Sequence, residues 1–195
     1  VLVVNGEKLS DTIRFQLNDL DDLKRRIAAY SLGDAGAAAL LTPATDESGI
    51  CFQRFRSAGQ HWKLCTIQGG GSMFPFDVDK HYFEGQTLEL TSVIQLESEG
   101  FLDECLMDSG WTRDDIELVF THQVSSRTFK SVADFCHLPE DKFHKVFANY
   151  GNTAAASIPL ALHDAQQKGL LRKGKKVLLI GLAAGVSISV QLIIW

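Results

Sequence analysis

Hydrophobic positions in the first part of the chain predict three strands joined by polar segments. Val1–Val4 is an apolar run that indicates a buried strand, and it ends at the turn signal Asn5-Gly6. Residues 9–31 are mostly polar, and leucines at helical spacing within them predict a solvated helix or a lid. The small apolar run Ala37–Leu41 predicts a second strand, which we expect beside the first. Ser48–Arg56 predicts a third.

From Gly85 onward the pattern alternates between helical and extended periods. The Gly-rich stretch before it, 57–84, indicates a connection, so we expect an N-terminal unit over 1–56 and a C-terminal unit over 85–195. Alternation of strands and helices favours a layered α/β fold, whose last two strands form an antiparallel hairpin. The predicted helices are 86–109, 125–137 and 153–168, and the predicted strands are 116–121, 143–148, 176–182 and 188–195.

Composition narrows the class of protein. The chain has 195 residues, 45% of them hydrophobic and 22% charged, which is typical of a globular protein with a buried core. A net charge of -5 argues against a broad nucleic-acid-binding face. Apolar runs near the C-terminus are interrupted at Gly185, so we expect no membrane span. The partners should therefore include neither nucleic acid nor a membrane.

Cysteine usage and the first residues give two further expectations. The four cysteines, Cys51, Cys65, Cys105 and Cys136, are widely spaced, which favours free thiols in a reducing cytoplasm over a disulfide framework or a metal site. The chain opens directly in a strand pattern without a starting Met or a signal peptide. We therefore expect that another segment normally precedes Val1.

Three fragments place polar or small residues where strands are predicted to end. His122 follows a buried strand, where a ligand site of an open α/β sheet would lie, although a structural histidine is equally compatible with this position. Asn152 follows Gly151 and opens a helix, so it is either a crevice residue or a cap. The small residues 181–187 join two apolar strands and present backbone N–H groups that could hold an oxyanion, or they form a plain hairpin.

Together these fragments resemble the β-ketoacyl-ACP synthase III group of the thiolase-like condensing enzymes. The resemblance runs through LVVNGEKLS, LGDAGAAALL, FTHQVSSRTF, NYGNTAAASIPLAL and GKKVLLIGLAAGVSISVQLIIW. It implies a thiolase-like α-β-α-β-α layered fold, of which this chain would supply the C-terminal half and the last strands of the N-terminal half. It also implies formation of a thioester on a cysteine, followed by decarboxylation of a malonyl thioester and attack of the resulting carbanion on the acyl group.

The resemblance assigns roles to six residues. The expected catalytic groups are the His122 imidazole, the Asn152 amide and the backbone N–H of Ala184 as an oxyanion donor. The family's HQAN reads HQVS here, with Ser125 in place of an asparagine. Ser125, Arg127 and Gly151 are the expected residues for pantetheine, substrate or carrier protein.

None of the four cysteines lies in the family's nucleophile setting, so we expect the nucleophilic Cys upstream of this chain. The implied partners are that upstream part, an acyl carrier protein or CoA thioester, and a second copy in a homodimer, with thioester substrates and no separate cofactor or metal. Acyl-length selectivity is expected to depend mainly on walls outside this chain. Departures from the family pattern favour a secondary-metabolism member, such as a polyketide enzyme, over fatty acid initiation. Acyl transfer to an alcohol or amine, and a non-catalytic partner subunit, remain alternatives.

Overall fold

Four strands form the central sheet of the protein. In the computed structural model, which describes residues 1–44 and 46–195, the strand order is β3-β8-β7-β6. β7 pairs with β8 antiparallel and with β6 parallel, and β3 pairs with the other edge of β8 antiparallel. The predicted C-terminal hairpin is confirmed. The strands are β3 (Gly49–Ser57), β6 (Leu118–Thr121), β7 (Lys176–Ala183) and β8 (Ser187–Ile194).

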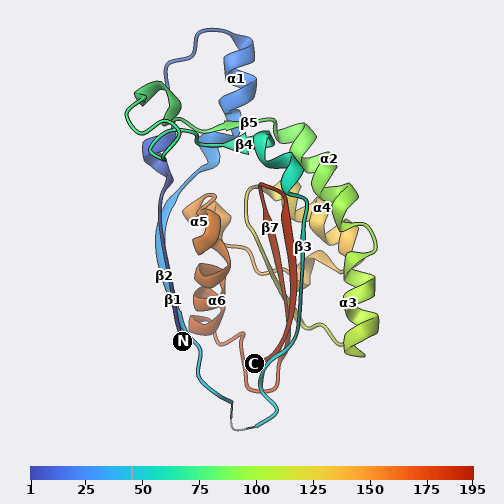
Figure 1. Ribbon diagram of the computed structural model, residues 1–195. Coiled ribbons are helices and arrows are strands. Elements are labelled where there is room, and N and C mark those ends of the chain that lie inside the picture. The colour runs from blue at the N-terminus through green and yellow to red at the C-terminus, as the bar shows by residue number, and fades with distance from the viewer. Residues whose placement is uncertain (45) are drawn as a thin grey trace.

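Helices cover both faces of this sheet (Figure 1). One face carries α2 (Thr87–Ser98), α3 (Phe101–Ser109) and α4 (Ser126–Cys136), and the other carries α5 (Phe147–Tyr150) and α6 (Ser157–Gln167). A hydrophobic core lies on each face of the sheet. Successive side chains of β6 point to opposite faces, so Val119 packs toward α2–α4 whereas Phe120 packs toward α6. None of the helices in the described ranges is long and apolar enough to cross a bilayer.

A two-stranded ribbon forms a further layer outside α6 (Figure 1). β1 (Leu2–Lys8) pairs antiparallel with β2 (Asp34–Leu40), with Leu2 opposite Leu40, so the expected neighbourhood of these two segments is confirmed. Asn5 Nδ2 donates to Ala155 O over 2.9 Å and ties the ribbon to the segment before α6. The ribbon, α6, the sheet and the α2–α4 layer give four successive layers, in the order expected for a thiolase-like fold.

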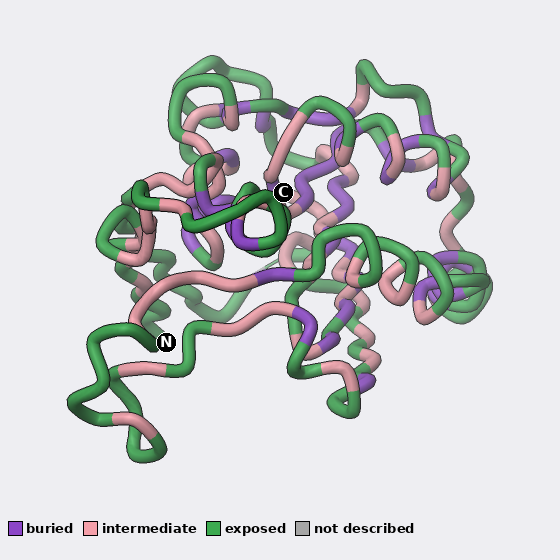
Figure 2. Tube along the Cα trace, turned by 90° about the horizontal axis from the view of Figure 1, so that it is seen from above, coloured by how far each residue is buried: buried purple, intermediate pink, exposed green. Residues whose placement is uncertain are grey.

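Apolar side chains of the ribbon remain exposed in this chain. Leu2, Val4 and Leu40 are 63%, 66% and 71% exposed, although the strand pattern predicted burial. Figure 2 shows the same contrast, with purple buried segments in the middle of the molecule and green exposed segments near the N-terminus. The pattern identified the strand correctly, but the burial that it predicted is not found in the residues that the structure describes.

Three local expectations were wrong. Asn5-Gly6 is not a turn, because β1 continues through both residues to Lys8. The helix expected over 86–109 divides into α2 and α3 at Gly100, whose φ of 68° lies in the left-handed region that ends a helix. The strand expected over 143–148 is reduced to a single bridge between Val119 and Phe143, after which the chain turns into α5.

The sheets do not follow the expected division into units. Gly49–Ser57 was assigned to an N-terminal unit over 1–56, and β3 pairs with β8 near the C-terminus, with an irregularity between Ile50 and Phe52. The β1–β2 ribbon is a separate sheet. The change of sheet therefore falls between Leu40 and Gly49, before the Gly-rich connection at 57–84. The assignment of these sheets to two halves of a larger protein stays a prediction.

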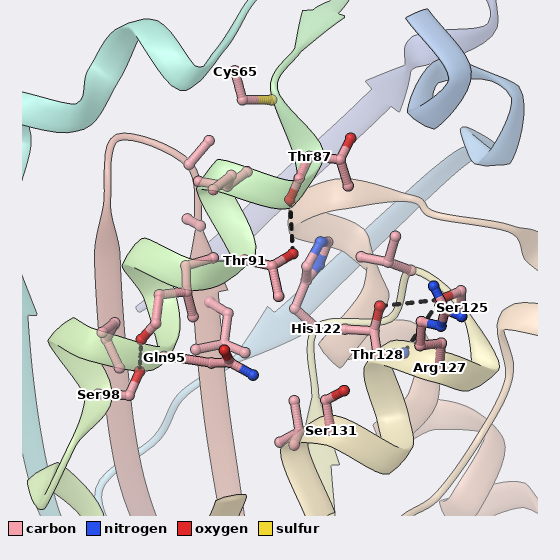
Figure 3. Close-up of a pocket in the computed structure, with 18 of the residues that line it drawn as sticks. Cys65, Thr87, Thr91, Gln95, Ser98, His122, Ser125, Arg127, Thr128 and Ser131 are labelled. Atoms are coloured by element: carbon pink, nitrogen blue, oxygen red, sulfur yellow. Dashed lines mark hydrogen bonds between the residues drawn. The ribbon is translucent and has the colours of Figure 1, made fainter. Parts of the chain in front are cut away.

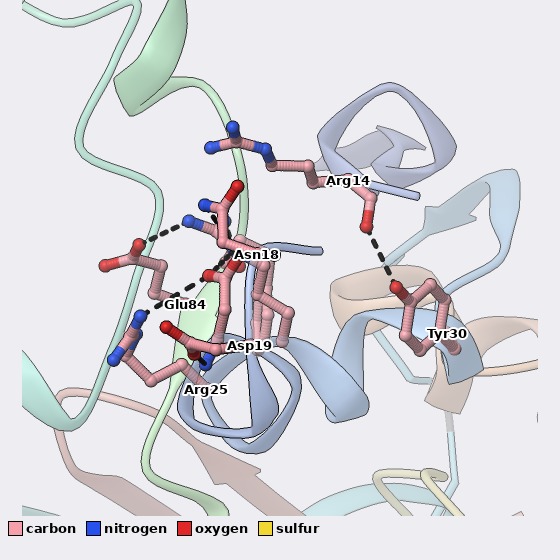
Figure 4. Close-up of polar contacts among 9 residues, drawn as sticks. Arg14, Asn18, Asp19, Arg25, Tyr30 and Glu84 are labelled. Atoms are coloured by element: carbon pink, nitrogen blue, oxygen red, sulfur yellow. Dashed lines mark hydrogen bonds and ion pairs between the residues drawn. The ribbon is translucent and has the colours of Figure 1, made fainter. Parts of the chain in front are cut away.

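The buried side chain of Arg26 ties the polar segment 9–31 to the rest of the fold. Within it the only α-helix of the described residues is α1 (Leu20–Arg26), which Asp19 caps by accepting from the Asp22 N–H over 2.7 Å. Arg26 is 5% exposed and donates to Asp22 Oδ1 over 2.7 Å and to Glu84 Oε1 over 2.8 Å. Figure 4 shows polar contacts of this region, with Asn18, Asp19 and Arg25 near Glu84. Glu84 begins β5 (Glu84–Gly85), which pairs with β4 (Cys65–Thr66).

Short 3₁₀ helices complete the connections of the fold. They are Leu9–Thr12, Ile27–Ser31, Gly59–Leu64, Val78–Lys80, Glu140–Lys142 and Ala154–Ala156.

Candidate active site

One cavity of about 610 Å³ opens at the carboxyl ends of β6 and β7. His122 directly follows β6, and Ala184 directly follows β7; because these strands are parallel, both residues reach the same edge of the sheet. Asn152 joins them from the turn after α5, and all three line the cavity. Figure 3 shows His122 between α2 and α4. The sequence therefore identified three residues that the fold brings to one place. The direction of the Ala184 N–H stays a prediction.

Hydrogen bonds hold the Asn152 backbone and side chain in place. Its N–H donates to Ser31 O over 2.7 Å, and its carbonyl accepts from the Gly33 N–H over 2.9 Å. The side-chain Oδ1 accepts from the Ala154 N–H over 3.1 Å. Since the oxygen of the amide is engaged in this local turn, its NH₂ group is the part left to donate into the cavity.

Gly151 makes this arrangement of the chain possible. Its φ is +69°, and a Cβ at this position would lie 2.7 Å from Ser31 O. Gly151 was expected to bind substrate or carrier. It does not line the cavity, although the next residue does. Its evident role is to let the backbone of Asn152 pass close to the 27–31 segment, and a direct binding role stays a prediction.

His122 sits in a setting that favours a neutral imidazole. Burial lowers the pKa of His122, and a hydrogen bond to the backbone of Ala154 opposes this effect to a smaller extent. Ser157 Oγ lies 3.1 Å from Nδ1 and 2.7 Å from Ala154 O. When the hydroxyl donates to the carbonyl, Nδ1 carries the ring proton. When the hydroxyl donates to Nδ1, Nε2 carries the proton and becomes a donor. The Ser157 hydroxyl thus controls what His122 offers to the cavity.

Gln123, which follows His122, organises the segment that leads to Asn152. Its side chain is fully buried and donates from Nε2 to His144 O over 3.0 Å. Its Oε1 accepts from the N–H groups of Val146 and Phe147 over 2.8 and 3.0 Å. These three bonds replace the strand pairing expected over 143–148. The sequence drew attention to this HQ pair, but it contained no local signal for the remote partners of Gln123.

Ser125 and Arg127 line the cavity at the start of α4 (Figure 3). Ser125 caps α4: its Oγ accepts from the Thr128 N–H over 3.2 Å and lies 3.0 Å from Thr128 Oγ1. Its hydroxyl is therefore committed to the helix start. Arg127 is exposed on the first turn of α4, where a guanidinium can meet an anionic group arriving from solvent.

The cysteines of the chain have environments unlike that of an activated nucleophile. All four are free. Cys65 and Cys136 line the cavity, and burial raises the pKa of Cys65 and raises that of Cys136 to about 12. Reactive cysteines require the opposite shift, which populates the thiolate. Within residues 1–44 and 46–195, no three His, Cys, Asp or Glu side chains are grouped so that they could hold a metal ion.

Sequence reasoning missed several cavity residues. The lining includes Ile27, Ala28 and Ser31 from the polar N-terminal segment and Thr87 and Thr91 from α2. These residues carry no motif of their own, because ordinary aliphatic and hydroxyl side chains give no chemical signal in a sequence. Only the fold brings them to His122.

Comparison with known proteins agrees with this geometry. Residues 106–195 match the family "3-Oxoacyl-[acyl-carrier-protein (ACP)] synthase III C terminal". These 90 of the 195 residues are similar to that family. The similarity extends beyond these residues. The whole chain is 30% identical, over an alignment of 207 residues, to the β-ketoacyl-[acyl-carrier-protein] synthase III of Clostridium tetani. The corresponding protein of Aquifex aeolicus is 28% identical over 187 residues.

Solved structures show the same likeness to synthase III in three dimensions. The 3-oxoacyl-[acyl-carrier-protein] synthase III structures of Aquifex aeolicus and Thermus thermophilus are both 27% identical and superpose with TM-scores of 0.81 and 0.83. All of this chain aligns with 57% and 58% of those chains. It likewise covers 59% and 55% of the Clostridium and Aquifex sequences. The chain has the thiolase-like α/β fold and spans somewhat more than half the length of these relatives.

Proposed function

We propose that this chain is part of a thioester-condensing enzyme. The enzyme would join an acyl group, delivered on CoA or an acyl carrier protein, to a malonyl-type extender with loss of carbon dioxide. The observation that carries the proposal is the convergence of His122, Asn152 and Ala184 on one cavity. Similarity to synthase III relatives over the whole chain supports it.

The proposed step needs hydrogen-bond donors at the carbonyl oxygen of the malonyl thioester. When the bond to carbon dioxide breaks, its electron pair enters the thioester and forms an enolate whose negative charge lies largely on that oxygen. The NH₂ of Asn152 is one donor, because Oδ1 is occupied by the Ala154 N–H. His122 Nε2 is the second once the Ser157 hydroxyl turns from Ala154 O to donate to Nδ1, because the ring proton then lies on Nε2. Loss of one such donor typically costs about 10²–10³ in rate.

We further propose that the nucleophilic Cys, and with it the first acylation, belongs to a part of the enzyme outside this chain. The raised pKa values of the cavity cysteines support this proposal. The thioester substrates would carry the chemistry without a separate cofactor, the whole enzyme would be a homodimer, and Arg127 would meet the phosphate of CoA or an acidic carrier protein. Four free thiols agree with a cytoplasmic location.

The decisive experiment separates acylation from decarboxylation in the whole enzyme. His122→Ala and Asn152→Ala should both still form the acyl-enzyme, followed by intact mass. Each should release carbon dioxide from labelled malonyl thioester at least about 100-fold more slowly than the parent. His163→Ala, on the outer part of α6 and away from the cavity, is the matched control. Parental rates of carbon dioxide release in both cavity variants would refute the two-donor mechanism and favour acyl transfer. Absence of acyl-enzyme in the parent would favour a non-catalytic subunit.

A further inference from the structure

The chain between α5 and α6, which we call the 152–157 turn, carries two groups that lie close to the proposed chemistry. Asn152 lines the cavity, and Ser157 Oγ lies 3.1 Å from His122 Nδ1. Between them Ala154 has a φ of +42°, in the left-handed region that residues with a Cβ rarely adopt. A strained residue of this kind persists only where its surroundings hold it. The contacts that hold this turn therefore set how Asn152 and Ser157 face His122.

The first contact point holds Asn152 at the start of β2. The Asn152 N–H donates to Ser31 O over 2.7 Å, and the Gly33 N–H donates to Asn152 O over 2.9 Å. β2 begins at Asp34, directly after Gly33. One end of the turn is therefore fixed to the β1–β2 ribbon.

The second contact point is Asn5 of β1. Its Nδ2 donates to Ala155 O over 2.9 Å. Asn5 is paired with Ala37, three residues along β2 from Asp34. Ala155 is likewise three residues along the turn from Asn152. The ribbon, which runs alongside α6 in Figure 1, therefore contacts the turn at two separate points, and two points fix the direction of a segment as well as its place.

The Asn5 amide is oriented for this bond. Its Oδ1 is buried and, within the part of the chain that the structure describes, has no hydrogen-bond partner. Turning the amide over would place Oδ1 against Ala155 O, and two acceptors cannot bond to each other. A buried polar atom without a partner is costly. The bond from Nδ2 to the turn is therefore the side-chain contact that accounts for an asparagine at this position.

We infer that Asn5 is a positioning residue for the release of carbon dioxide in the proposed condensation. This inference rests on the proposed function for the reaction that it affects. Asn5 is not among the residues that line the cavity, so it acts through Ala155 O and not on the substrate. Without its bond, Ala154 can relax from its left-handed conformation, and the Asn152 amide then moves relative to His122. A misplacement of about 1 Å can slow a reaction by about 100-fold.

Two substitutions in the full-length enzyme remove the donor in different ways. Asn5→Leu has a similar size and no polar group. Asn5→Asp keeps the shape and places an ionised carboxylate against Ala155 O. In both variants kcat for carbon dioxide release from labelled malonyl thioester should fall about 10-fold to 100-fold. The KM of that substrate and the formation of acyl-enzyme should stay at the parental values, because the misplaced donors act on the enolate and not on the ground state.

Val3→Ala and Glu7→Gln are the matched controls. Val3 and Glu7 lie on β1 two residues before and after Asn5, so their side chains are on the same face of the ribbon. Val3→Ala trims an apolar side chain of the ribbon, and Glu7→Gln exchanges a carboxylate for an amide, but neither removes the bond to Ala155. Both should keep the parental kcat, even where thermal denaturation shows a lower melting temperature. Parental kcat in both Asn5 variants, or an equal loss of kcat in Val3→Ala, would overturn the inference.

Hydrogen exchange measured by mass spectrometry separates this inference from the proposed function. The N–H groups of Ala154 and Ala156 are bonded within the 152–157 turn, and they should exchange faster in Asn5→Leu than in the parent or in Glu7→Gln. Faster exchange, in an enzyme whose carbon dioxide release does not depend on His122, would establish that the Asn5 contact holds the turn and would refute condensation. Unchanged exchange and unchanged kcat, in an enzyme that requires His122, would overturn the inference and leave the proposed function standing.

Discussion

Replacing Gln123 tests whether one buried amide holds the segment that carries Asn152. In Gln123→Leu the side chain keeps roughly its volume, so no large cavity forms, but three backbone groups lose their partners. They are the carbonyl of His144 and the N–H groups of Val146 and Phe147. A buried polar group without a partner costs about 1–3 kcal/mol. The surrounding structure can relax in part, and Phe147 is less buried than the other two residues. We therefore expect the free energy of unfolding to fall by about 3–5 kcal/mol.

The assay is equilibrium urea denaturation of the purified enzyme, followed by circular dichroism. Gln53→Leu is the matched control, because Gln53 is exposed on β3. The free energy of unfolding of this variant should stay within about 0.5 kcal/mol of the parent value. The same variants assayed for carbon dioxide release should show a loss of activity only for Gln123→Leu, since residues 144–150 lead directly to Asn152.

Gln123→Glu supplies a second, pH-dependent measurement. A protonated glutamic acid can donate to His144 O and accept from the Val146 N–H, whereas its ionised form cannot donate. Burial raises the pKa of such a carboxyl above that in the unfolded chain. Relative to the parent, Gln123→Glu should therefore be most stable below the unfolded pKa and lose stability as the pH rises through the folded pKa. A loss below about 1 kcal/mol in Gln123→Leu, or a pH-independent difference for Gln123→Glu, would refute this reasoning.

Two further predictions concern the residues beside the cavity. Gly151→Ala should lower the free energy of unfolding by about 1–3 kcal/mol, because its Cβ would meet Ser31 O at a positive φ. Gly110→Ala should lower it less, because the Cβ at that position has open space at a similar φ. Equal shifts in melting temperature for the two variants would contradict the close approach at Gly151. Burial lowers the pKa of His122 in the folded protein. Below the ordinary histidine pKa of about 6.5, the unfolded chain therefore takes up a proton on this residue, whereas the folded protein does not. The stability associated with a neutral His122 is therefore complete above that pH and falls as the pH falls below it. His122→Gln should flatten this slope in urea titrations between neutral and mildly acidic pH, and parallel curves would show that His122 is not the group responsible.

The sequence predicted elements whose signals are local. β7 and β8 followed from two apolar runs separated by small residues, and α4 from its apolar period and its Ser125 cap. His122 and Ala184 were each placed at the end of an apolar strand by the local pattern, but the resemblance to the condensing enzymes assigned them to one site. The structure supplies the physical reason, because β6 and β7 pair in parallel and end at the same edge of the sheet.

What the sequence could not predict depends on partners distant in the chain. The pattern of β3 indicates a strand but does not say that it pairs with β8, about 140 residues away. The helix over 86–109 looks continuous by periodicity, because one left-handed residue at Gly100 leaves the apolar period on both sides intact. The 143–148 segment has the composition of a strand, yet the buried side chain of Gln123 binds the backbone groups that a neighbouring strand would have paired with.

Hydrogen bonds of Asn152 join this site residue to the N-terminal segment that lines part of the cavity. Its backbone N–H and carbonyl are hydrogen-bonded to Ser31 and Gly33, and this segment follows Ile27 and Ala28, which also line the cavity. Arg26, directly before them, forms ion pairs with the buried Asp22 and with Glu84, whose side chain is 41% exposed. A shift of residues 26–33 would therefore move the Asn152 amide relative to His122. The position of His122 is set separately, because it directly follows β6 of the central sheet. Since donor positions must be held to a fraction of an ångström, the ion pairs of Arg26 belong to the structure that positions the site, although they lie outside the cavity.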